Sequence, residues 1–201
     1  MEFAQVAGLR RMVRAFSGSP VPESTLEEVL QRASRPPSAG NTQGWTAVVL
    51  VGPTETDRFW SATTTADWRA RSSRWPGLGR APVVVSVFAD PAAYVARYAE
   101  PDKADERLGG AEDEWPIPYW FVDAGFALLL LLLAATDAGL GACLLGNFRG
   151  EEALRGALGV PEGRRYVGAV ILGEPGEGDR ASASTRRPRR DLGDIFRRGS
   201  W

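Results

Sequence analysis

The chain has 201 residues, 44% of them hydrophobic, which is enough for one substantial core, so a single domain over residues 1–201 is expected. The formal net charge of −1 provides no global field for nucleic acid or an anionic membrane, so neither is expected as a partner. With no histidine and one cysteine, Cys143, a Ser-His-Asp triad and an intrachain disulfide are excluded and a metal cluster is disfavoured, so redox chemistry would need an imported cofactor.

The N-terminal part is expected to form two helices and a buried strand. Residues 2–14 have no apolar core of a secretory signal and are interpreted as a helix that bears arginines. Residues 25–33 form the second helix, with a capping hydroxyl and glutamates at its start and two prolines after its end. A loop, 38–44, then leads to the strand 45–51, whose apolar run suits burial on both faces.

The middle of the chain is less regular. Residues 54–80 are predicted to be helical but irregular, and they contain three tryptophans. Residues 82–88 form a second buried strand. Residues 90–118 are acidic and poorly periodic, which predicts a helical excursion or a lid.

A long helix is predicted over residues 118–138. Its most hydrophobic run, 124–135, includes six consecutive leucines and is too short for a bilayer, which needs about 20 apolar residues. A helix that is apolar all round must be buried on every side. The neighbour is either a second subunit or, alternatively, the rest of the same chain.

The C-terminal part continues with strands and a helix. A strand over 142–145, a short helix over 151–158 and a strand over 166–172 are expected. The tail, 174–201, is rich in Gly, Arg and Ser, and we expect it to lie extended over a neighbour. Strands separated by helices indicate an α+β layered fold.

Two motifs in the N-terminal part suggest ligand binding. On a helix, Arg10 and Arg14 would share a face and could hold a phosphate between planar guanidinium groups, or else form a solvated basic face. In the loop before the first strand, Gly40 permits close approach of a flat ligand, and Asn41 and Gln43 offer donors and acceptors to a ring. An ordinary helix-to-strand loop is the alternative.

Two motifs follow in the C-terminal part. Gly146 and Asn147 come after a short strand and would let backbone amides face outward, or they form a simple glycine turn. Arg186 and Arg187 stand before a proline in the tail, where a solvated charge run is the alternative.

In this order, the four motifs resemble those of the FMN-dependent nitroreductase family. That family typically opens with Arg-x-Ser-x-Arg/Lys-x-Phe and continues with Pro-Ser-x-x-Asn-x-Gln-Pro-Trp. It then has a long central helix, a Gly-Leu-Gly turn into a strand, and a late basic cluster before a proline. The resemblance runs from Arg10 to Pro188, is weakest over 54–118, and is most specific in the two N-terminal motifs.

The resemblance implies a fold and an assembly. The fold would be an α+β, nitroreductase-like three-layer sandwich with a mostly antiparallel sheet flanked by helices. The molecule would be a homodimer whose long central helices pack at the interface, with FMN in clefts between the subunits. The tail, 174–201, would act as a clamp.

The resemblance also implies a role for each motif. Phosphate carries about two negative charges, so several cations are expected around it: Arg10, Arg186, Arg187 and, in place of a missing hydroxyl, Arg11. Arg14 would lie beside the N1/C2 edge of the flavin and stabilise the charge of the reduced ring. The loop laid on the ring by the opposite subunit would comprise Pro37, Ser38, Ala39 and Asn41. Gly146 and Asn147 would face the flavin N5.

Three departures from the family pattern bear on these roles. Met12 stands where serine is usual in the phosphate site, which removes a hydroxyl donor. Gly44 replaces the usual proline, which we expect to loosen the loop. The third departure is the unmatched region 90–118, which in the family helps to roof the substrate site. Candidate walls for a stacked substrate are therefore Trp115, Tyr119 and Trp120, and the alternative is that they are ordinary core aromatics.

The implied activity is a ping-pong transfer of hydride from NAD(P)H through the flavin N5 to a nitroaromatic or quinone-type acceptor. No protein acid or base is needed for the central step, which agrees with the lack of histidine. A cytoplasmic location is expected. The alternatives are a flavin oxidase or dehydrogenase of small-molecule biosynthesis, and a flavin-binding protein without turnover.

Overall fold

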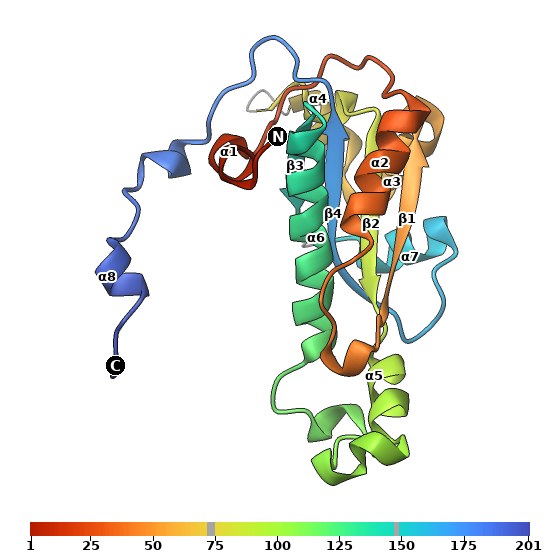
Figure 1. Cartoon of the computed structure of the whole chain (residues 1–201). Helices are drawn as coiled ribbons and strands as arrows, with labels where there is room; N and C mark the ends of the chain where they lie inside the picture. The colour runs from red at the N-terminus through yellow and green to blue at the C-terminus, as the bar shows by residue number, and fades with distance from the viewer. Residues whose placement is uncertain (72–74, 147–148) are drawn as a thin grey trace.

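The computed structural model describes residues 1–71, 75–146 and 149–201, and for residues 69–71 it describes the backbone alone. Within them the chain forms a four-stranded sheet of order β1-β2-β4-β3, in which every neighbouring pair is antiparallel (Figure 1). The strands are β1 (Trp45–Val51), β2 (Val83–Ala89), β3 (Gly141–Leu145) and β4 (Arg165–Gly173). Helices cover both faces, which confirms the predicted α+β sandwich.

Each face of the sheet has its own hydrophobic core. On one face α6 (Tyr119–Asp137) packs on the sheet together with α2 (Glu23–Ala33). On the other, α3 (Gly52–Thr63) packs with α7 (Glu151–Leu158). Every residue of β2 is buried, and its alternate side chains enter the two cores in turn, as expected for a strand that is covered on both faces.

Shorter elements connect this frame. The remaining helices are α1 (Phe3–Leu9), α4 (Ala66–Arg71), α5 (Pro91–Tyr98) and α8 (Leu192–Ile195). The 3₁₀ turns are η1 (Ala39–Asn41), η2 (Leu78–Arg80), η3 (Pro101–Glu106), η4 (Glu112–Glu114) and η5 (Ala183–Arg186). The elements α5, η3 and η4 form the predicted helical excursion, which projects beyond one end of the sheet (Figure 1).

The long helix α6 is buried on one side only. By length and composition it could cross a membrane, with a mean hydropathy of 1.8, but half of that window is buried inside this chain, as in the core helix of a globular protein. Phe121, Phe126 and Leu129 remain exposed on its other side. Complete burial within the chain, one of the two expectations for this helix, is therefore wrong.

The predicted helix over residues 2–14 is wrong in its second half. Helix α1 ends at Leu9, and the chain then runs extended beside the edge strand β3. Met12 forms a parallel bridge with Ala142, and the Val13 N–H donates to the Ala142 carbonyl at 2.9 Å. The open edge of β3 supplies these hydrogen bonds, and Val13 is buried in the core, so tertiary pairing outweighs local helix propensity.

The tail behaves differently from the rest of the chain. From residue 180 onward its residues are exposed, apart from Ser182. Figure 1 shows it leaving the sheet past α1 and ending well away from the body of the molecule.

Candidate functional site

The arginine-bearing segment, residues 10–14, places Arg10 and Arg14 on the same side, as predicted, but it is extended and not helical. In an extended chain, side chains two residues apart share a side, so Arg10, Met12 and Arg14 lie on one side and Arg11 on the other. Arg11 forms an ion pair with Asp179, whereas the Arg10 side chain has no hydrogen bond or ion pair within the described part of the chain. The prediction that Arg10 and Arg14 share a face on a helix was therefore wrong about the helix.

Asp179 fastens this segment to the start of the tail. Its carboxylate accepts the backbone N–H of Arg14 at 2.7 Å and that of Ala15 at 3.2 Å, besides its ion pair with Arg11. Burial alone would raise the pKa of Asp179, but these hydrogen bonds and the Arg11 charge outweigh it and lower the pKa. Sequence reasoning missed Asp179, because its partners lie about 165 residues away.

Arg14 is held against an aromatic ring. Its guanidinium carbon lies 4.9 Å from the centroid of the Trp75 ring, and its Nη1 donates to the Met12 carbonyl at 3.3 Å. The guanidinium carbon of Arg180 lies 5.9 Å from the same centroid. Arg14, Trp75, Asp179 and Arg180 line a cavity of about 220 Å³, so a charged and an aromatic surface meet beside the N-terminal segment.

Met12, which stands where serine is usual in the family pattern, uses its thioether sulfur to contact β3. Its Sδ lies 3.4 Å from the Leu144 backbone N–H, which donates to it. Strand β3 ends one residue later, at Leu145, and leads directly into Gly146. The structure thus brings the first and third motifs together at one strand edge, while Asn147 lies outside the described residues.

The second motif forms a loop in an unusual backbone conformation. Gly40, Asn41 and Gln43 have positive φ angles of 60°, 53° and 53°. The Ser38 hydroxyl accepts the Gln43 N–H at 2.8 Å and closes the loop on itself. Left-handed backbone at non-glycine residues costs free energy and persists where surrounding contacts impose it.

The contact that imposes this conformation comes from the long helix. Asp123 on α6 is 2% exposed, and one of its oxygens, Oδ2, accepts both the Ala39 N–H at 2.8 Å and the Tyr94 hydroxyl at 2.7 Å. Burial, and then the hydrogen bond to Asp123, raise the pKa of Tyr94. The sequence analysis did not single out Asp123, and the available signal was a lone acid beside the apolar run 124–135.

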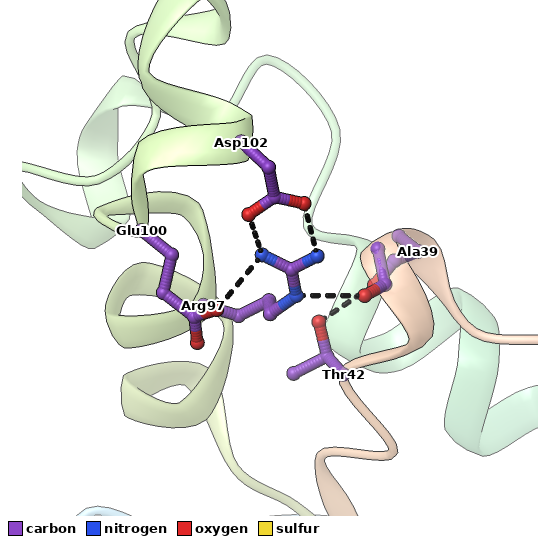
Figure 2. Close-up of polar contacts among 6 residues, drawn as sticks. Ala39, Thr42, Arg97, Glu100 and Asp102 are labelled. Atoms are coloured by element: carbon purple, nitrogen blue, oxygen red, sulfur yellow. Dashed lines mark hydrogen bonds and ion pairs between the residues drawn. The ribbon is translucent and has the colours of Figure 1, made fainter.

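A second brace comes from the excursion. Figure 2 shows the Arg97 guanidinium between the loop and two acids of its own region. Its Nε donates to the Gly40 carbonyl at 2.9 Å, and its two terminal nitrogens each donate to Asp102 at 2.7 Å. Hydrogen bonding to Arg97 lowers the pKa of Asp102. Part of the region 90–118 therefore supports the loop Ser38–Gln43.

Gly44 does not loosen this loop, which corrects the expectation from the family pattern. A Cβ at this position would lie 2.4 Å from Tyr94 Cε2 and 3.2 Å from the Asp90 carbonyl oxygen. The Gly44 carbonyl also accepts the Asp90 N–H at 2.9 Å. Glycine is thus required by the close approach of the Tyr94 ring, the same ring that binds Asp123.

Two of the three predicted substrate aromatics are core residues. Trp115 and Trp120 are 7% and 6% exposed, and each packs edge-to-face against Tyr94. The Trp115 indole N–H donates to the Leu108 carbonyl at 2.9 Å, which fixes the ring. Both rings are thus covered within this chain, whereas Tyr119 is 39% exposed at the start of α6.

The remaining predicted residues lie on accessible surface. Pro37, just before the loop Ser38–Gln43, and Asn41, within it, are exposed. Arg186 and Arg187 are exposed on the tail, and within the described residues their side chains form no hydrogen bond or ion pair.

Known proteins are similar to this chain over most of its length, including the segment 10–14, the loop Ser38–Gln43 and Gly146. A family model described as Nitroreductase family matches residues 8–174. A Thermus thermophilus protein named NADH dehydrogenase is 30% identical over 189 residues, 87% of each chain. An Archaeoglobus fulgidus protein named as an NADH dehydrogenase/NAD(P)H nitroreductase is 28% identical over 169 residues, 83% of this chain and 81% of the other.

A solved structure shares the fold. The protein from Desulfovibrio desulfuricans, described as a nitroreductase in complex with FMN, gives a TM-score of 0.66 at 21% identity, over 100% of this chain and 98% of the other. The family match includes the segment beside β3, the loop Ser38–Gln43 and Gly146, and it ends where the tail begins.

Proposed function

The chain belongs to the nitroreductase family and is an NAD(P)H-dependent oxidoreductase, and we propose that it holds FMN and passes electrons through it to a nitroaromatic or quinone-type acceptor. One observation carries the proposal: the bridge between Met12 and Ala142 places the arginine-bearing segment beside the strand that leads to Gly146. This arrangement supports a site in which Arg10 and Arg14 would hold the cofactor at the same strand edge where Gly146 would face it.

The residues present fit the phosphate end of FMN. Arg10 has a guanidinium without a protein partner in the described part of the chain, whereas Arg11 lies on the other side of the segment and is paired with Asp179. A dianionic phosphate favours several such planar donors. Arg186 and Arg187 would complete the set from the tail of either subunit, which makes the tail a clamp.

The residues also fit the ring end. When bound, FMN accepts and donates hydride at N5. Arg14 would supply a fixed positive charge at the edge where negative charge gathers on reduction, and the Trp75 ring holds its guanidinium in place. The loop Pro37–Asn41, with its backbone fixed by Asp123, would form a flat wall. With no histidine in the sequence, the chain contributes binding, orientation and charge.

A second copy of the chain would complete the site. The exposed apolar side of α6, with Phe121, Phe126 and Leu129, supports a homodimer in which the two long helices pack together. FMN would then lie between the subunits, and one open face of its ring would serve the nicotinamide and the acceptor in turn, by a ping-pong mechanism. We propose a cytoplasmic location for this assembly.

The first test uses the purified protein. A flavin absorption spectrum with FMN released on denaturation, bleaching by anaerobic NADH or NADPH and recovery on adding a quinone are expected. Sedimentation should give a dimer. A colourless preparation that takes up no added FMN would contradict the proposal, whereas bound FMN that neither nucleotide bleaches would favour an oxidase or a flavin carrier.

Arg14 gives a sharper test of the ring assignment. Replacing Arg14 by alanine removes the fixed charge, and we expect the two-electron midpoint potential of bound FMN to fall by roughly 20 mV, equivalent to about 1 kcal/mol. Spectroelectrochemistry measures this potential, with Arg107→Ala as a matched arginine control on the excursion. An unchanged potential in Arg14→Ala counts against the role.

A further inference from the structure

Positive charge is concentrated in residues 186–201. This segment contains six arginines and two aspartates, a net charge of +4, so the preceding 185 residues carry a net charge of −5. The overall charge of −1, which predicted no membrane partner, is therefore the average of two unlike parts. A short basic block beside apolar residues is typical of a segment that binds an anionic surface.

Most of these arginines are available to a ligand. Four of them are exposed, and their side chains form no hydrogen bond or ion pair within the described part of the chain: Arg186, Arg187, Arg189 and Arg198. The Arg197 guanidinium carbon lies 5.5 Å from the centroid of the Trp201 ring, so a cation and an aromatic ring lie together in the tail. Arginine binds phosphate groups well, because its planar N–H donors match their oxygens.

The same segment exposes large apolar side chains. Leu192 and Phe196 are 73% and 69% exposed, Ile195 is more than half exposed, and Trp201 is fully exposed. Leu192 and Ile195 stand three residues apart in α8, so they share one side of that turn. The Phe196 N–H donates to the Leu192 carbonyl at 2.8 Å, which keeps a third apolar residue beside them. Single exposed apolar residues are common, but a group of this kind marks an interaction site.

The arginines and the apolar side chains call for a partner that offers both negative charge and an apolar layer. A free phosphate would bind the guanidinium groups and leave the rings in water. In an anionic bilayer, charged headgroups lie directly above acyl chains, so one segment can bind through both kinds of side chain. Tryptophan is favoured at that depth, because its ring is apolar and its N–H is polar.

The position of α8 in the fold lets it reach such a surface. Figure 1 shows α8 beyond α1 and well away from the sheet, while Asp179 fastens the start of the tail. The family match ends at residue 174, so the segment lies outside the matched part of the chain. Pro188 separates it from Arg186 and Arg187, which the proposed function assigns to FMN. Residues 189–201 can therefore bind elsewhere while those two arginines hold the cofactor.

We propose that residues 189–201 attach the protein reversibly to a membrane surface that contains anionic phospholipids. The arginines contact headgroup phosphates, and the side chains of Leu192, Ile195 and Phe196 enter the interface below them. This attachment uses no membrane-spanning helix, so α6 keeps its place on the sheet. It agrees with the proposed cytoplasmic location, since the cytoplasmic leaflet has a negative surface potential.

The test is sedimentation of the FMN-loaded protein with lipid vesicles. One set contains phosphatidylcholine alone, and the other contains equal parts of phosphatidylcholine and phosphatidylglycerol. We expect binding to the mixed vesicles to be about a hundredfold stronger, because each arginine near an anionic surface strengthens binding about fivefold. High salt should release the protein, since it screens the headgroup charge.

Two variants assign the binding to this segment. A chain that ends at Pro188 keeps Arg186 and Arg187 but loses α8, and we expect it to lose vesicle binding and to keep its FMN and its oxidation of NADH or NADPH. Phe196→Ser keeps every charge and should weaken binding about tenfold, because an apolar ring no longer enters the interface. Phe3→Ser is the matched control on α1, where Phe3 is 76% exposed, and it should bind like the wild type.

The opposite results overturn the proposal. They are no binding to either kind of vesicle, equal binding to both, or full binding by the chain that ends at Pro188. Absence of vesicle binding together with a dimer that dissociates on truncation would assign the segment to a second copy of the chain. Vesicle binding does not require FMN, so a protein that binds vesicles and takes up no FMN would contradict the proposed function and leave this inference standing.

Discussion

The loop Ser38–Gln43 and the tail 174–201 are the two parts of the candidate site that the opposite subunit is proposed to meet, and they are built in contrasting ways. The loop is held by side chains of α6 and α5, through Asp123 and Arg97. The tail is held at its start by Asp179 and is then exposed. The chain thus holds one wall of the proposed site by its own contacts, whereas it fastens the tail only at its start.

This difference has a physical origin. The loop conformation costs free energy at Asn41 and Gln43, and buried hydrogen bonds offset that cost before any ligand arrives. The tail carries six arginines between residues 186 and 198 and buries little apolar surface. If the tail closes over a partner or an anion, as proposed, its new contacts must offset the conformational entropy that it loses. Changes to the loop should mainly affect the free energy of unfolding, and changes to the tail should mainly affect the affinity for FMN.

The largest expected effect comes from removing the loop's central acceptor. Asp123→Leu removes the acceptor of the Ala39 N–H and of the Tyr94 O–H, and we expect the free energy of unfolding to fall by about 2–4 kcal/mol. Asp123→Asn is the control, because one amide oxygen can accept both bonds that Oδ2 accepts now. Urea denaturation measures both. Equal stability of Asp123→Leu and wild type, or equal damage by both variants, would contradict the assignment.

Gly44→Ala tests whether the loop is tight or loose. A new Cβ within 2.4 Å of the Tyr94 ring must displace that ring, which should cost about 1–3 kcal/mol of unfolding free energy. The control is Gly8→Ala on the exposed α1, where a Cβ meets nothing within 4 Å and alanine should stabilise by roughly 0.5–1 kcal/mol. Thermal unfolding distinguishes the two. A neutral Gly44→Ala would mean that the loop yields easily.

Truncation of the tail before Thr185 gives the opposite pattern. Since the removed residues are exposed, we expect the unfolding free energy to change by less than about 0.5 kcal/mol. If Arg186 and Arg187 clamp the phosphate, FMN affinity should fall about tenfold or more, because charge-assisted hydrogen bonds are lost. Fluorescence titration with FMN measures this, and Arg197→Ala is a control within the tail. Full retention of FMN refutes the clamp.

The smallest effect concerns the anchor between the two regions. The pKa of Asp179 is lowered in the folded chain, so its carboxylate stabilises the fold above the ordinary carboxyl pKa of about 4. That contribution is lost as pH falls through the lowered folded value. Asp179→Asn should therefore be about 1 kcal/mol less stable at pH 7, with the difference fading under acid conditions. A difference that stays constant with pH would assign the effect to packing alone.

Much of the fold could be predicted because its signals are local. The apolar runs of β1, β2 and α6 appear in the sequence as contiguous segments, and β2 is buried on both faces as predicted. The same prediction is wrong for β1, which lies at the edge of the sheet and has only Leu50 buried. The helix over residues 2–14 failed because its second half pairs with β3, more than 100 residues away. Local propensity contains no information about a free strand edge.

The sequence by itself determined the class of fold, the family and the four motifs, since each depends on residues that are close along the chain. Only the tertiary structure decided which acids hold those motifs, that Gly44 accommodates Tyr94, and that Trp115 and Trp120 are core residues. The physical reason is that hydrogen-bond partners and neighbouring rings are set by packing. Asp123 and Ala39 are 84 residues apart, and nothing in the sequence between them specifies that they meet.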